Sequence, residues 1–290
     1  MLKMFQRGAD RAKLRDHLLE TIAEMSRTGI LPTMPQATNA ALGLAGNPDT
    51  DLDELCAVIR TDVGLTACVL RLANSVAYAR RQPATTLQSA ITTVGARKTC
   101  DIVVAARARC LYGAAGGHAA ALWNHALAVG IAAEQLAKLR RNVAPESTFL
   151  PGLLHDIGQI PFFTTDAASF AELEHAVSGQ RQRDRVSIEL KRWEVDHAEA
   201  GGVLAERWGL TTEQAVAIRW HHDPKRAGPY QPIAELIHAA DALVHGVDFD
   251  AKTTSIEGLE LPDIGLSADD WTTCIERVRE SVAQQRAVFA

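Results

Sequence analysis

The sequence predicts an all-α fold, organised as a two-lobed helical bundle. Apolar residues recur at the helical period in nearly every segment, and the alternating pattern of a half-buried strand is almost absent. The chain has 290 residues, enough for one or two domains with cores of their own. Its clearest change in composition is the glycine-rich stretch 113–117. We therefore expect an N-terminal helical lobe at residues 1–113 and a second lobe at residues 118–290 that includes the C-terminal helix.

The helices expected in the first lobe begin and end at recognisable signals. Leu14, Leu18 and Ile22 lie on one apolar stripe, and Gly29 ends that first helix. Asp51 is a typical N-cap for the third helix, whose first turns are acidic. The helices expected in this lobe span residues 8–28, 36–45, 52–60, 61–75, 87–94 and 97–111.

The segments between these helices carry most of the lobe's polar groups. Residues 31–35 contain two prolines and form a stiff entry to the second helix. Asn74-Ser75 is interpreted as a hydrogen-bonding device that joins a helix end to the following loop. That loop, 78–83, is basic. Its Arg80-Arg81 pair could bind an anionic ligand or partner, but a solvated charge pair is the favoured interpretation.

The second lobe is expected to be helical throughout. Asp196 is a typical N-cap, which places His197 in the first turn of its helix, and Thr211 or Thr212 caps the next one. The last helix is predicted to be a peripheral packing element. The helices expected in this lobe span residues 119–140, 146–157, 167–179, 182–194, 197–208, 213–222, 233–246 and 267–288.

Composition excludes several classes of protein. The chain is 47% hydrophobic, 22% charged and 5% aromatic, which is typical of a globular protein and not of a disordered one. A net charge of −5 gives no electrostatic signature of nucleic-acid binding, so direct binding of nucleic acid is not expected. No apolar run is long enough to span a bilayer, and the N-terminus lacks the features of a signal peptide. Five scattered cysteines without CxxC spacing indicate buried thiols in a reducing compartment, so we expect the cytoplasm.

The pair His155-Asp156 ends an apolar run, and it is the most informative feature of the sequence. Burying an imidazole beside a carboxylate costs several kcal/mol unless something compensates. A divalent cation would compensate, since it binds both a neutral nitrogen and a hard oxygen. The alternative is an ordinary helix C-terminus, in which His155 bonds to a carbonyl, Asp156 lies in solvent and Gly158 ends the helix.

Other polar residues of metal-ligand type also lie on apolar helices. His125 alone would be read as a core histidine, and His197, His221 and His222 as solvated residues at helix ends. Asp241 is harder to explain in this way, because a carboxylate inside an apolar helix requires a cation, an arginine or several donors. One shared site explains all these residues together better than seven separate coincidences. The candidate metal ligands are His125, His155, Asp156, His197, His221, His222 and Asp241.

Within this set, Asp156 is expected to bridge two ions, and the histidines and Asp241 to complete their coordination. The i, i+3, i+7 spacing of His238, Asp241 and His245 also places these three residues on roughly one helix face. The cofactor expected from these ligand types is one or two divalent ions, of iron, manganese, magnesium or zinc.

The order His125, His155-Asp156 and Asp241 resembles the HD superfamily of metal-dependent phosphohydrolases. His197 and His221-His222 resemble the extended ligand set of the HD-GYP branch, which cleaves cyclic di-GMP. The chain as a whole resembles the HDOD family, a regulatory relative of HD-GYP, over roughly residues 24–248. This resemblance implies an HD-domain-like C-terminal lobe. Its motifs lie at 31–35, 62–65, 70–75, 90–95, 123–125, 152–158, 196–201 and 208–210.

Two departures from the HD-GYP pattern bear on activity. Members of that branch usually carry a lysine after His-Asp-Ile-Gly, where this chain has Gln159, and the Gly-Tyr-Pro signature is missing after His221-His222-Asp223-Pro224. Phosphodiester cleavage requires fixed positive charge near the metal ions. Arg219 or Lys225 could supply that charge.

Three functions follow from the resemblance, and the first is favoured. In the first, the chain would be a non-catalytic bacterial signalling module that acts on a protein partner or a nucleotide second messenger. Its binding surface would lie on the first lobe and contain Arg71, Asn74, Tyr78, Arg80 and Arg81. Alternatively, it is a metal-dependent phosphohydrolase that acts on a nucleotide or cyclic dinucleotide, with His125 as a ligand or a proton carrier. The third alternative is a sensor that binds a metal or nucleotide without turnover.

Overall fold

The prediction of an all-α fold is confirmed. The computed structural model describes residues 52–78, 82–113, 119–165, 167–177, 182–247 and 256–289, together with scattered positions between 16 and 44. Within these residues no strand occurs. None of the described helices combines the length and the apolarity needed to cross a lipid bilayer.

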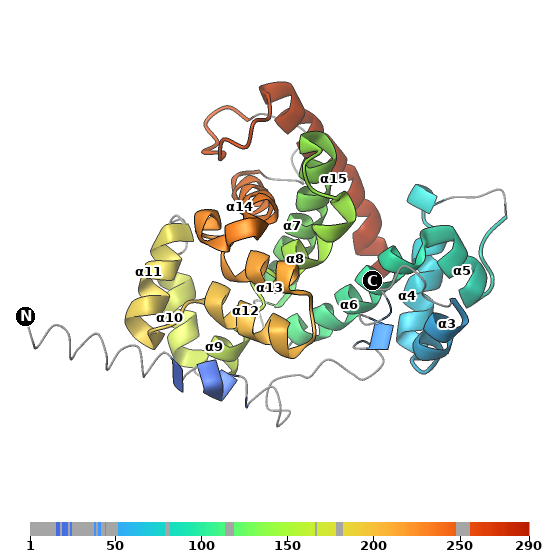
Figure 1. Ribbon diagram of the computed structural model, residues 1–290, viewed down its shortest axis with the longest axis horizontal. Coiled ribbons are helices and arrows are strands. Elements are labelled where there is room, and N and C mark those ends of the chain that lie inside the picture. Colours follow the sequence, from blue (N-terminus) through green and yellow to red (C-terminus); the bar gives the residue numbers. More distant parts are fainter. Residues whose placement is uncertain are drawn as a thin grey trace, which may run out of the picture.

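The helices from α3 to α6 begin at one end of the molecule, and the last of them runs from there toward the centre (Figure 1). They are α3 (Leu52–Arg60), α4 (Val63–Ala73), η1 (Val76–Tyr78), α5 (Leu87–Val94) and α6 (Ala96–Gly113). Asp62 caps α4 by accepting a hydrogen bond from the backbone N–H of Leu65 at 3.0 Å. Asn74, at the other end of α4, donates to the carbonyl of Ala84 at 2.9 Å and accepts from its N–H at 2.8 Å. The predicted role of Asn74 is therefore confirmed.

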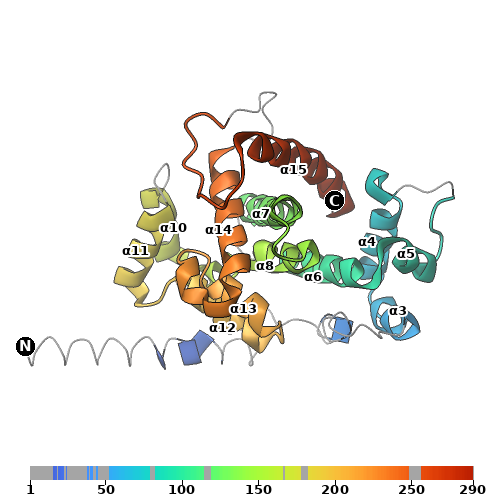
Figure 2. The ribbon, with the colours of Figure 1, turned by 45° about the horizontal axis from the view of Figure 1, so that its top comes forward.

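The remaining helices include a central pair, and the others pack around it. They are α7 (Ala119–Arg140), η3 (Pro145–Ser147), α8 (Phe149–Leu154), α9 (Gln159–Thr165), α10 (Ala167–Val177), α11 (Gln182–Trp193), α12 (His197–Arg207), α13 (Thr212–Arg219), η4 (Pro224–Tyr230), α14 (Gln231–Gly246) and α15 (Ala268–Phe289). Figure 2 shows α7 and α8 at the centre, with α14 and α15 on two sides of α7.

Two glycines allow the central helices to approach closely. A Cβ atom at Gly130 on α7 would lie 2.9 Å from the carbonyl oxygen of Phe149, and one at Gly152 on α8 would lie 2.9 Å from the Cα of Gly130. Real Cβ atoms do not approach other atoms this closely, so α7 and α8 are in backbone contact here. This contact fixes the position of the polar residues that these two helices carry.

Gly158 produces a second close approach. A Cβ atom at this position would overlap the carbonyl oxygen of His197, at the start of α12. The turn that follows His155-Asp156 therefore passes directly against the N-terminus of α12. This contact brings His197 next to Asp156 although the two residues are far apart in the sequence.

The described apolar side chains form two buried clusters. The smaller cluster lies among α3, α4, α5 and the first part of α6, and includes Leu55, Ile59 and Ile91. The larger cluster includes residues of α6 through α15, together with Cys68 and Leu72 of α4 and Ile22. Because α6 contributes to both, with Val103 in the smaller and Ile102 in the larger, the helix connects them. The boundary predicted between residues 113 and 118 falls largely outside the described residues, so the division into two lobes stays a prediction.

The C-terminal helix α15 packs one face against the larger cluster and exposes much of the rest, in agreement with the expected peripheral packing element. Trp271, Ile275 and Val278 on α15 are buried in the larger cluster. Near its end, the carbonyl oxygen of Val288 accepts a hydrogen bond from Nε of Arg71 on α4 at 2.7 Å. The helix therefore packs against α7 and also contacts the first group of helices, which its own periodicity could not reveal.

Two other boundaries differ from the prediction. The helix expected at 146–157 is a 3-10 turn followed by the short α8, which ends at Leu154, so that His155 and Asp156 lie in the turn before α9. The loop expected around Gly228 to Pro232 is largely a 3-10 segment, and α14 begins at Gln231. The first difference shortens a helix next to the candidate site, and the second lengthens α14 by two residues relative to the expected 233–246.

Some predictions concern residues that the structure does not describe. The expected helices at 8–28 and 36–45 are described only at scattered positions, which are helical. The proline-containing segment 31–35, and the Arg80-Arg81 pair, lie outside the described residues.

Candidate metal centre

The side chains of all seven predicted ligands lie in one cluster, although they come from five parts of the chain. His125 lies in the second turn of α7, His155 ends α8 and Asp156 follows it in the turn before α9. The other four come from α12, the turn after α13, and α14: His197, His221, His222 and Asp241. Five of the seven side chains are buried: those of His155, Asp156, His197, His221 and Asp241.

One half of the cluster is centred on Asp241 and one oxygen of Asp156. Oδ1 of Asp241 lies 3.1 Å from Nε2 of His125 and 3.5 Å from Nε2 of His155. Oδ2 of Asp156 lies 3.5 Å from Nε2 of His155 and 3.9 Å from Nε2 of His125. The two imidazole nitrogens are themselves 3.3 Å apart. Two carboxylates and two histidines therefore face a common point.

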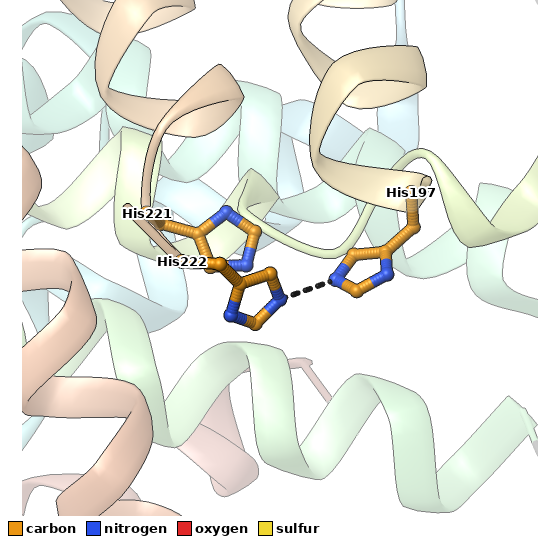
Figure 3. Close-up of side chains that lie close together, drawn as sticks. All are labelled: His197, His221 and His222. Atoms are coloured by element: carbon orange, nitrogen blue, oxygen red, sulfur yellow. Dashed lines mark hydrogen bonds between the residues drawn. The ribbon is translucent and has the colours of Figure 1, made fainter. Parts of the chain in front are cut away.

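The other half contains three histidines and the second oxygen of Asp156. Oδ1 of Asp156 lies 3.0 Å from Nε2 of His197, which is 2.9 Å from Nε2 of His222. Figure 3 shows His221 and His222 projecting from the turn after α13 toward His197 at the start of α12. The two oxygens of Asp156 thus face different groups of histidines, as expected for a carboxylate that bridges two ions.

Three of the histidines are fixed in the orientation that a metal ligand requires. Nδ1 of His155 and of His221 each lie 2.7 Å from a backbone carbonyl oxygen, those of Gly152 and Ile218. A carbonyl can only accept, so each Nδ1 carries a proton and each Nε2 is directed into the cluster, where its lone pair is available to an ion once that nitrogen is deprotonated. Nδ1 of His197 lies 2.6 Å from a carboxylate oxygen of Glu189 and is held in the same way.

Glu189, on α11, was not among the predicted site residues. It is fully buried, and its Oε2 accepts hydrogen bonds from both Nδ1 and the backbone N–H of His197, the latter at 2.9 Å. A carboxylate that orients a ligating histidine is common at metal sites. Nothing in the strongly charged sequence of α11 distinguishes Glu189 from its solvated neighbours, so the sequence offered no signal for it.

Arg185 links Glu189 to the position where HD-GYP enzymes usually carry a lysine. Its guanidinium is buried, donates to Gln159 at 3.3 Å and to Glu189 at 3.5 Å, and is also bonded to Glu174. Gln159 is itself buried. The positive charge nearest to Gln159 is therefore paired with two carboxylates.

His245 also belongs to the cluster, and His238 does not. Nε2 of His245 lies 3.3 Å from Oδ1 of Asp241, and its ring packs against that of His125 with centroids 4.5 Å apart. The i, i+4 spacing between Asp241 and His245 was the available signal. His238 is not among the groups of side chains that could share an ion.

The two carboxylates of the cluster are strongly acidic. Burial alone would raise the pKa of Asp156, but His155 and His197 outweigh it and hold the pKa well below its usual range. The pKa of Asp241 is also well below its usual range, because His125 and His155 outweigh the effect of burial. Both groups are therefore ionised at neutral pH.

The histidines divide into two classes. Burial opposes protonation of His155, but Asp156 and Asp241 raise its pKa to about 9, and Glu189 and Asp156 raise that of His197 well above its usual value. Burial and neighbouring histidines lower the pKa of His221 to about 3, and that of His222 also falls. In the absence of an ion, protons on His155 and His197 balance the two carboxylates. An ion would displace them.

The cluster fits a divalent cation. The buried atoms Oδ1 of Asp156, Oδ1 of Asp241 and Nε2 of His221 have no hydrogen-bond partner among the described residues, although other ring nitrogens lie within about 3 Å of both oxygens. Such short separations without hydrogen-bond geometry are typical of atoms that share an ion, since ligands bonded at about 2.0–2.2 Å lie roughly 3 Å apart. Imidazole and carboxylate donors suit iron, manganese or zinc.

Comparisons with known proteins identify relatives of this chain. An uncharacterized protein of Treponema pallidum (strain Nichols) is 26% identical over 220 residues, which are 75% of this chain and 43% of that protein. The chain therefore spans less than half the length of this relative.

Solved structures share the fold over nearly the whole chain. A candidate phosphohydrolase from Shewanella amazonensis SB2B is 25% identical, with a TM-score of 0.73 over 93% of this chain and 98% of that one. An HDOD domain protein of unknown function from Geobacter sulfurreducens is 24% identical, with a TM-score of 0.69 over 93% and 96% of the two chains. A candidate signal transduction protein from Marinobacter aquaeolei VT8 is 20% identical, with a TM-score of 0.72 over 96% of this chain and 65% of that one.

The match to a family is more specific than these structural similarities. The family model for the HDOD domain matches residues 31–224, more than half of the chain. This match includes His125, the His155-Asp156 pair, His197 and the His221-His222 pair. The chain belongs to the HDOD domain family.

Proposed function

We propose that this chain is a bacterial signalling module whose helical body holds one or two divalent cations, and that it acts by binding a protein partner or a nucleotide in the cytoplasm. The observation that carries this proposal is the cluster itself. Its Nε2 atoms and carboxylate oxygens converge in a buried pocket, and the Nδ1 atoms of His155, His197 and His221 are held by acceptors behind them. An arrangement of this kind is costly to bury without a cation.

A regulatory role is favoured over catalysis by the environment of Gln159. Phosphodiester cleavage requires positive charge that is available to the substrate. Arg185, the cation at this position, is buried and is paired with Glu174 and Glu189. Its charge is therefore neutralised by these carboxylates and is not available to a substrate. It stabilises the carboxylate of Glu189, which contacts His197.

The second candidate function is a metal-dependent phosphohydrolase acting on a nucleotide or a cyclic dinucleotide. It is favoured by the position of Asp156 between the two groups of histidines, and by the similarity to the candidate phosphohydrolase from Shewanella amazonensis. A bound divalent cation would supply Lewis acidity toward a phosphate oxygen and a water molecule. His125, which is only partly buried, would be a ligand or carry a proton at the edge of the cluster.

Elemental analysis of protein purified without a chelator tests the first proposal. We expect one or two equivalents of a transition metal per chain, and a loss of metal from Asp156→Asn, because this change weakens the carboxylate that faces both halves of the cluster. Glu172→Gln is the control: Glu172 is exposed and pairs with Arg192, outside the cluster. Metal-free protein, in purified form and after incubation with Fe²⁺, Mn²⁺ and Zn²⁺, would contradict the proposal.

Turnover separates the two candidate functions. Metal-loaded protein is incubated with cyclic di-GMP, or with bis-p-nitrophenyl phosphate, in the presence of Mn²⁺ or Fe²⁺. The signalling proposal predicts no product above that of Asp156→Ala. Product formation that Asp156→Ala abolishes would establish the phosphohydrolase instead.

A further inference from the structure

A pocket of about 630 Å³ opens beside the metal cluster. It lies among α11, α12, α13 and the turn that follows α13, and His222 forms part of its wall. Since Nε2 of His222 is 2.9 Å from Nε2 of His197, the pocket borders the half of the cluster formed by these histidines. The volume is in the usual range for small-molecule sites.

A paired arginine and tryptophan form one part of this pocket. The guanidinium of Arg226 lies 3.8 Å from the centroid of the Trp220 ring, a close cation–π contact. Arg226 is exposed and forms no ion pair with any carboxylate of the described residues. Its charge and its hydrogen-bond donors are therefore available to a ligand, in contrast to those of the buried Arg185.

Groups of both charges surround this pair. Arg219 also lines the pocket, and its side chain lies against the Cα of Gly202, where a Cβ atom would overlap it. It donates to Glu206 at 2.8 Å. The carboxylate of Asp223, next to His222, has no hydrogen-bond or ion-pair partner among the described residues. The pocket thus offers a free guanidinium, a free carboxylate and an aromatic ring within reach of the cluster.

We propose that the pocket binds a nucleotide, with its phosphate toward the cluster at His222 and its base against Arg226 and Trp220. This proposal rests on the proposed function, because the cations of the cluster would hold the phosphate. Nucleobases stack on aromatic rings and on arginine planes. Their N–H groups bind carboxylates and their ring acceptors bind arginine, which matches Asp223 and Arg226. An inorganic anion would not stack on the Trp220 ring, so it would not explain the aromatic part of the pocket.

The test compares two phosphate esters that differ only in the base. Binding of GMP and of ribose 5-phosphate to the Mn²⁺-loaded protein is measured by isothermal titration calorimetry. We expect GMP to bind roughly tenfold more tightly or better, because stacking of one base has about that effect on affinity. Equal affinities, or no binding of GMP, would overturn the proposal.

Variants assign the effect to the pocket. Arg226→Ala should lower GMP affinity to about that of ribose 5-phosphate and leave the metal content unchanged, because Arg226 is not a ligand. Arg207→Ala is the matched control: it removes the same side chain from an exposed position at the end of α12 that does not line the pocket. GMP affinity that is unchanged by Arg226→Ala would overturn the proposal. A protein that holds metal but does not distinguish the two esters would contradict this inference alone, whereas a protein that never binds metal would contradict the proposed function.

Discussion

Replacing Glu189 by glutamine should weaken metal binding without removing a metal ligand. Oε2 of Glu189 accepts from Nδ1 of His197 at 2.6 Å, and so holds the proton on Nδ1 and leaves Nε2 free to bind an ion. Glutamine has the same shape but only one acceptor oxygen. The backbone N–H of His197 and the guanidinium of Arg185 also donate to Glu189. The NH2 group of glutamine would therefore face at least one hydrogen-bond donor and could not accept from it.

The size of the effect follows from the position of this contact. Loss of an acceptor behind a ligating histidine typically lowers metal affinity by about 10- to 100-fold, or roughly 1.4–2.7 kcal/mol. Glu189 is fully buried, so solvent screening does not reduce its effect. Competition of the protein with a fluorescent chelator for Zn²⁺ or Mn²⁺ measures the change directly.

Glu174→Gln provides the matched control. Glu174 also pairs with Arg185 but does not contact His197. This variant should lose some folding stability and keep a metal affinity within about twofold of the wild type. Wild-type affinity in Glu189→Gln, or equal losses in both variants, would refute the idea that Glu189 orients His197.

Three further predictions concern stability. Removing metal with a chelator should lower the midpoint of thermal unfolding, since an ion present at 100 times its Kd stabilises the folded state by about 2.7 kcal/mol; an unchanged midpoint would show that the folded protein binds no ion. Burial raises the pKa of Asp101 from 3.8 to about 7 in the folded protein, although Lys98 opposes the shift, so the folded state binds the proton more tightly and its stability falls as the pH rises from about 4 to 7. Urea unfolding at several pH values should therefore show Asp101→Asn gaining stability relative to wild type as the pH rises over this range. The gain is about 1.4 kcal/mol for each unit by which the pKa of Asp101 differs between the folded and unfolded states. A difference in unfolding free energy between variant and wild type that does not change with pH would contradict the raised pKa. Gly158→Ala should destabilise the protein by at least about 1–3 kcal/mol, because the new methyl group overlaps the carbonyl oxygen of His197; urea unfolding equal to that of the wild type would show that the turn can move.

Four of the candidate ligands were predictable from the sequence because each is a polar residue in or at the end of an apolar helix: His125, His155, Asp156 and Asp241. Asp241 has two apolar residues on each side of it in α14, and His155-Asp156 follows the buried α8. These interruptions, together with their order along the chain, were sufficient to predict that the residues converge.

Residues behind the ligands gave no such signal. Glu189 lies in a helix with many charged residues, and only the packing of α11 against the start of α12 makes it buried. The separate helix α9 was missed because Gly158 and Pro161 are usually read as helix breakers, although proline is tolerated in the first turn of a helix. The burial of α15 depends on contacts with α7 and α4, distant segments that local periodicity does not describe.

Anomalous X-ray scattering from crystals of protein purified without a chelator would test the central claim most directly. The account predicts a peak, or two, bounded by Asp156 and the imidazoles of His155 and His197, at the absorption edge of a transition metal. It would be contradicted by featureless anomalous density in crystals soaked with Mn²⁺ and Zn²⁺, with His155 and His197 protonated and hydrogen-bonded directly to Asp156.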